Sequence, residues 1–80
     1  MGKALSARTI AERGLRIYRA KLKARLEKSH QGEIVVINVL TGDYVLAPSP
    51  SEARRTFQAK FPGRPSYMLR VGDLAVWTKG

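Results

Sequence analysis

The run from Glu33 to Leu40 constrains the fold more than any other part of the chain. It reads Glu-Ile-Val-Val-Ile-Asn-Val-Leu and is the most apolar and most β-branched stretch in the sequence. Successive side chains of a strand point to opposite faces, so this run presents apolar groups on both. Such a pattern is typical of a strand inside a sheet that is covered on each side. It therefore predicts a central strand around which the other elements are arranged.

One helix is predicted before the first hairpin in the sequence and a second one after it. Residues 7–28 have helical periodicity, with Gly14 as a mild interruption. The expected core stripe of this helix consists of Ala7, Ala11, Leu15, Tyr18, Leu22 and Leu26. The second helix begins with a capping box, in which Ser49 is the N-cap, Pro50 takes the first position and Glu52 completes the motif. It is expected to end near Lys60 and to bury Phe57.

Four strands complete an α+β domain in the order α-β-β-α-β-β. They are predicted at 33–40, 44–47, 66–71 and 74–78. A right-handed crossover places the third strand beside the first, which gives a four-stranded antiparallel sheet in the order 2-1-3-4, packed by two helices. We expect both helices on one face. Because the central strand is apolar on both sides, either the helices divide between the faces or an open face binds a partner. Residues 1–6 are expected to be a flexible N-terminus and 7–80 a single domain.

The net charge of +9 is concentrated in the first helix. Residues 1–28 hold nine basic and two acidic residues, whereas residues 29–80 hold six basic and four acidic ones. This asymmetry favours an anionic partner, and the alternative is a solvated face that keeps a small protein soluble. The predicted anion-binding residues are Arg13, Arg16, Arg19 and Lys23. A second apolar seam, which predicts a protein partner or a homo-oligomer, consists of Ile10, Ile17 and Ala24.

The sequence shows no equipment for catalysis. The chain has no cysteine and one histidine, His30, so neither a thiolate site nor a histidine cluster for a metal is expected. The acidic residues have turn, capping or ion-pairing duties, and no phosphate-binding glycine loop occurs. We therefore expect no enzyme activity, no cofactor and no small-molecule substrate. No apolar run approaches the roughly 20 residues of a membrane span. Neither a membrane partner nor a signal peptide is predicted, and we expect a cytoplasmic protein.

A set of turn and core residues resembles a family of small uncharacterised bacterial α+β domains, in which a basic helix precedes a hairpin–helix–hairpin core. The matching positions are His30, Gly32, Glu33, Val35, Ile37, Val39, Thr41–Tyr44, Ser51–Ala53, Tyr67 and Leu69–Gly72. The resemblance implies a cytoplasmic bacterial protein and specifies the fold better than an activity. The hairpin and the following helix are also similar to HicB-type antitoxins, although Pro48-Ser49-Pro50 replaces their glycine-rich turn. That likeness implies a protein-binding, toxin-neutralising role.

These observations predict a small non-catalytic interaction module. The first hypothesis is a protein partner that binds the basic N-terminal helix or an open sheet face. The alternative is a nucleic acid bound by the basic face of the same helix.

Overall fold

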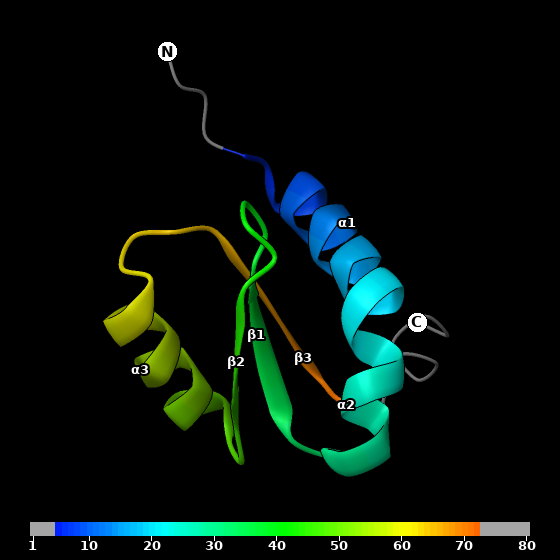
Figure 1. Cartoon of the computed structure of the whole chain (residues 1–80). Coiled ribbons are helices and arrows are strands. Elements are labelled where there is room, and N and C mark those ends of the chain that lie inside the picture. The colour runs from blue at the N-terminus through cyan, green and yellow to red at the C-terminus, as the bar shows by residue number, and fades with distance from the viewer. Residues whose placement is uncertain (1–4, 73–80) are drawn as a thin grey trace.

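The fold has three layers: an N-terminal helical segment, a three-stranded sheet and a second helix (Figure 1). The computed structural model describes residues 5–72. The elements are α1 (Ala7–Ile17), a π-helical turn η1 (Tyr18–Leu22), α2 (Lys23–Ser29), β1 (Ile34–Asn38), β2 (Tyr44–Ala47), α3 (Pro50–Lys60) and β3 (Ser66–Arg70). The first three follow one another without a gap and form one helical segment.

The sheet is antiparallel in the order β2-β1-β3. All five residues of β1 are buried, which confirms the predicted central strand. Val36 lies opposite Val45 of β2 and Met68 of β3. The prediction of four strands in the order 2-1-3-4 is wrong for the described residues, which form three. The stretch expected to be the fourth, 74–78, lies outside them. Two neighbours suffice to place β1 inside the sheet, so its apolar pattern carries no information about a fourth strand.

Each face of the sheet has its own hydrophobic core. One core lies under the N-terminal segment and contains Tyr18, Leu22, Leu26, Val35, Ile37, Leu69 and Val71. The other lies under α3 and contains Ile34, Val36, Val45, Ala47, Ala53 and Phe57. The expectation that both helices cover one face is therefore wrong, and the helices divide between the faces (Figure 1). The reason is the alternation of β1 side chains, since each apolar set needs its own cover.

Gly14 does not interrupt the helix, contrary to the prediction. It is buried within α1, where the helix comes so close to β3 that an added Cβ atom would lie 2.5 Å from Cβ of Tyr67. The helix begins just after Ser6, whose hydroxyl accepts a hydrogen bond from the N–H of Thr9 at 3.1 Å. Gly14 is therefore a contact residue between helix and sheet.

The irregular part of the segment is the π-helical turn. There the N–H of Lys23 donates to the carbonyl of Tyr18, five residues earlier. Both buried side chains of the turn, Tyr18 and Leu22, point into the core. The turn is thus one residue longer than a regular helical turn and keeps both side chains buried.

The second helix begins at the predicted residue, but only the Ser49 half of the capping box forms, since the Glu52 side chain does not accept from the N–H of Ser49. Ser49 is its N-cap and accepts a hydrogen bond from the N–H of Glu52, and Pro50 opens the helix. Phe57 is 2% exposed, which confirms it as a core residue. The half-buried Phe61 packs on it, with the ring centres 5.1 Å apart. The helix therefore holds its face of the sheet mainly through one aromatic side chain.

Candidate anion-binding surface

The N-terminal helical segment carries a dense set of exposed basic side chains. They are Arg8, Arg13, Arg16, Arg19, Lys21, Lys23, Arg25 and Lys28. Two of them are paired within the segment, Arg8 with Glu12 at 3.7 Å and Lys23 with Glu27 at 3.0 Å. The other six form no ion pair with the described residues. We call these six the basic surface, and their charge is not neutralised within the described part of the chain.

Arg13 and Arg16 border a groove between α1 and the end of β1. Ile17 and Val39 form the rest of its lining, and its volume is about 310 Å³. The two guanidinium groups therefore lie beside an apolar floor. This combination suits a ligand with both anionic and apolar parts, because the charged groups can bind the anion while the floor contacts the rest.

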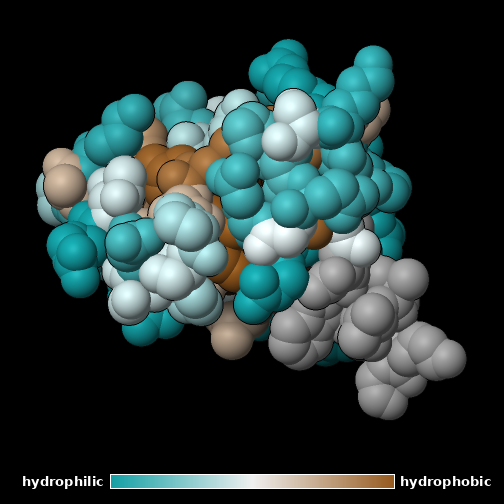
Figure 2. Space-filling model, turned by 90° about the horizontal axis from the view of Figure 1, so that it is seen from below, coloured by the Kyte–Doolittle hydropathy of each residue, from teal (hydrophilic) through white to brown (hydrophobic). Residues whose placement is uncertain are grey.

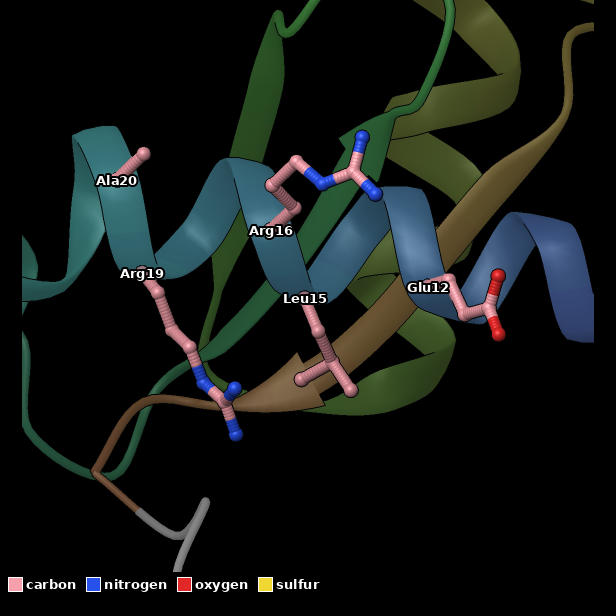
Figure 3. Close-up of a pocket in the computed structure, with 5 residues that line it drawn as sticks. All are labelled: Glu12, Leu15, Arg16, Arg19 and Ala20. Atoms are coloured by element: carbon pink, nitrogen blue, oxygen red, sulfur yellow. The ribbon is translucent and has the colours of Figure 1, made fainter.

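Arg16 also borders a second, shallow groove on the outer side of the helix. Glu12, Leu15, Arg19 and Ala20 complete its lining, and its volume is about 690 Å³. Figure 3 shows that Arg16 and Arg19 diverge: Arg16 points toward the β1–β2 hairpin and Arg19 toward the end of β3. The two side chains therefore border the same groove from opposite sides.

Lys23, the fourth predicted anion-binding residue, is exposed but is paired with an acidic residue of the same segment. Its ammonium donates to Oε1 of Glu27 at 3.0 Å, and Oε2 of Glu27 accepts from the hydroxyl of Tyr18 at 2.9 Å. The backbone of Gly72, just after β3, also acts on the Tyr18 hydroxyl and favours its ionised form. Lys23 thus belongs to a network with Glu27 and Tyr18 that lies beside the end of β3.

The same network shifts the pKa values of two of its members. Burial, together with the hydrogen bond to Glu27, raises the pKa of Tyr18 to about 12. The hydrogen bond from Lys23, followed by that from Tyr18, lowers the pKa of Glu27. Around neutral pH the network therefore joins a neutral phenol, a carboxylate and an ammonium.

The predicted apolar seam is only partly available to a partner. Ile10 and Ile17 are half-buried, and Ala24 is exposed. Ile17 packs against the core under the N-terminal segment, so the core uses a residue that the seam hypothesis left free. Within residues 5–72, the one large apolar side chain that is exposed is Leu40, at 50%, and it lies in the β1–β2 turn.

Sequence reasoning missed Lys21, Arg25 and Lys28 as members of the basic surface. Lys21 reaches toward the β1–β2 turn, where its ammonium lies 3.8 Å from the position of a Cβ atom on Gly42. The ion pair of Lys23 could have been predicted from the sequence, because Glu27 follows it at the i,i+4 spacing of helical ion pairs. No comparable acidic partner stands four residues after Lys21 or Arg25.

The described residues offer no metal site. His30 contacts Glu33 at 3.1 Å, and among residues 5–72 no group of three potential ligands forms. None of the helices in this part of the chain is long and apolar enough to cross a membrane.

Comparison of the chain with protein-family models, with curated proteins and with solved structures finds no match. The likeness to small bacterial domains and to HicB-type antitoxins therefore stays a prediction from the sequence.

Proposed function

We propose that this chain is a non-catalytic module that binds nucleic acid through the basic surface of its N-terminal helical segment. The observation that carries the proposal is the unneutralised charge of that surface. Its six basic side chains are exposed and form no ion pair with the described residues. Such a surface attracts a polyanion and gains free energy when condensed counterions are released.

Three arginines are the expected centre of the interface. Arg13, Arg16 and Arg19 follow one another at intervals of three residues, so they span roughly 9 Å along the helix axis. Guanidinium groups bind phosphate oxygens in a bidentate manner, which makes arginine the preferred residue for this ligand. The divergence of Arg16 and Arg19 seen in Figure 3 allows contacts to different phosphates.

A protein partner bound through apolar contacts has less support. Ile17 belongs to the core packing, and both faces of the sheet carry a helix. Leu40, in the β1–β2 turn, is the one large apolar side chain that is exposed among residues 5–72, and Ala24, the exposed member of the predicted seam, is small. A protein that binds this module would instead need an acidic surface to match the arginines.

Fluorescence anisotropy with labelled DNA and RNA oligonucleotides, single-stranded and duplex, tests the proposal. We expect binding whose log affinity falls linearly with log salt, with a slope of about −0.7 to −0.9 per phosphate contacted. The triple variant Arg13→Glu, Arg16→Glu, Arg19→Glu should abolish it. The matched control reverses three exposed arginines outside the N-terminal segment, Arg54, Arg55 and Arg64, and changes the net charge equally.

The two triple variants separate a site from general charge attraction. Loss of binding in the helix variant and retention in the control would support the proposal. Equal losses in both would mean that net charge alone drives the association, and absence of binding to any oligonucleotide would overturn the proposal. In that case a protein with an acidic surface becomes the preferred partner class.

A further inference from the structure

The outer edge of β2 has backbone groups that no strand among residues 5–72 pairs with. The N–H of Asn38 donates to the carbonyl of Asp43 at 2.7 Å, so these two residues form a hydrogen-bonded pair. In an antiparallel ladder such pairs alternate with pairs that are not hydrogen-bonded to each other. By this alternation Val45 bonds to β1, while its neighbours Tyr44 and Leu46 direct their N–H and C=O groups away from β1. No described residue supplies a hydrogen-bond partner for these outward groups.

Only part of the usual protection against pairing is present at this edge. Natural edge strands are very short or carry charged side chains, bulges or proline, which keep further strands from adding to the sheet. The β2 strand is short, at four residues, and Pro48 follows it, but Tyr-Val-Leu-Ala itself contains neither a charge nor a proline. Figure 2 shows hydrophobic surface in the middle of the underside of the molecule, between two hydrophilic flanks. An uncharged edge with outward donors and acceptors can bind an additional strand through main-chain hydrogen bonds.

We propose that the chain forms a symmetric homodimer in which β2 pairs antiparallel with β2 of a second copy. The edge is self-complementary in this arrangement. With Val45 on the two-fold axis, Tyr44 lies opposite the partner's Leu46 and Leu46 lies opposite the partner's Tyr44. Both pairs exchange their outward N–H and C=O groups, and each joins an aromatic with an aliphatic side chain on the same face, a favourable cross-strand combination.

The helical layers leave room for this pairing. On one face α3 lies over β2 and β1, and strands in a sheet are about 4.8 Å apart, so the two copies of α3 would lie roughly 10 Å apart. That is close to the usual distance between packed helices. Arg54 and Gln58 line a groove beside β3, so helical geometry puts Thr56 and Ala59, together with Glu52 and Lys60, on the flank above the free edge. The two small side chains permit the approach, and the two charged ones are of opposite sign.

On the other face the charged segments stay apart. There α1 contacts β3, the strand farthest from the dimer edge, and the two N-terminal segments would be separated by roughly five strand spacings, or about 24 Å. This exceeds the Debye length of about 8 Å at physiological ionic strength, so their repulsion is largely screened. A two-fold axis perpendicular to the sheet puts both segments on the same face. The dimer would thus present two basic surfaces side by side.

Sedimentation equilibrium of the full chain over a range of concentrations tests the dimer. We expect a mass of twice 8.9 kDa that dissociates on dilution. Thr56→Lys should raise the dimer dissociation constant about tenfold or more by introducing like charges between the two copies of α3. Gln58→Lys is the matched control, because it adds the same charge on the opposite flank of the same helix and should leave the constant unchanged.

Amide hydrogen exchange locates the contact independently. The N–H groups of Tyr44 and Leu46 should become protected as concentration rises, while that of Val45 is protected at all concentrations. A monomer throughout the range would overturn the proposal. So would a dimer that responds equally to Thr56→Lys and Gln58→Lys, or one without concentration-dependent protection at Tyr44 and Leu46. None of these outcomes depends on nucleic-acid binding.

Discussion

Replacement of Gly14 by alanine should destabilise this protein, although glycine is unfavourable inside a helix. In an exposed helix interior, Gly→Ala stabilises by about 1 kcal/mol, because alanine loses less backbone entropy on folding. Gly14 is different because it is buried against β3. A Cβ atom there would lie 2.5, 2.6 and 2.7 Å from Cβ, Cγ and Cδ2 of Tyr67.

The size of the effect follows from these distances. Ordinary contacts of a Cβ atom lie at 3.4–4 Å, so helix and strand must separate by about an ångström. The nearest atom is the Cβ of Tyr67, which is fixed to the strand backbone and cannot move aside as a side-chain tip would. Overpacking of this kind costs about 1–3 kcal/mol, and we expect the upper part of that range. After the helix-propensity gain is subtracted, the net loss is about 1–2 kcal/mol.

Urea and thermal denaturation followed by circular dichroism measure this loss. For a domain of this size, the expected decrease in Tm is roughly 4–16 °C. Ala24→Gly, at an exposed position of α2, is the control and should reveal the propensity contribution alone, a loss of about 1 kcal/mol. An increase in stability for Gly14→Ala would refute the close approach of α1 to β3.

Three further predictions concern the hydrogen-bond network and the second helix. The pKa of Tyr18 is raised from 10.0 to about 12, so the neutral phenol adds about 3 kcal/mol to the free energy of unfolding below pH 10. This stabilisation is lost as the pH rises from 10 through 12. Alkaline unfolding curves of Tyr18→Phe should lack this pH dependence. Ser49→Ala should lower the free energy of unfolding by about 0.5–2 kcal/mol, since an N–H at the start of α3 loses its acceptor; an unchanged urea midpoint would contradict this. Phe57→Ala should cost about 3–5 kcal/mol and leave the chain largely unfolded at room temperature, and a native circular dichroism spectrum would show that the core under α3 tolerates the cavity.

The parts of the fold that follow from local patterns could be predicted. The apolar run of β1 identified the central strand, and the Ser49–Pro50 pair identified the start of α3 to the residue. The arrangement of the layers could not be predicted in the same way. The two-sided pattern of β1 was compatible with a second helix on the opposite face and with a partner there, because both would cover the same side chains.

The errors in the N-terminal segment have a common physical cause. Glycine is unfavourable inside a helix, so Gly14 reads as a break. The need for glycine there comes from the contact with Tyr67, which is distant in the sequence. The spacing of Leu15, Tyr18 and Leu22 fits a regular helix, so it contains no signal for the π-helical turn. For the candidate surface, the pairing of Lys23 with Glu27 follows from spacing, but the link to the end of β3 through Tyr18 exists only in the folded chain.

The π-helical turn also bears on which changes in chain length the protein can accept. The hydrogen bond from Lys23 to Tyr18 closes a turn that is one residue longer than that of a regular α-helix, and both Tyr18 and Leu22 remain buried. Removal of the exposed Ala20 should therefore turn η1 into regular α-helix with only a small rotation of the segments on either side. A deletion in β1 would instead move every following side chain to the other face of the sheet. The turn is thus the place where homologous chains one residue shorter are most readily expected.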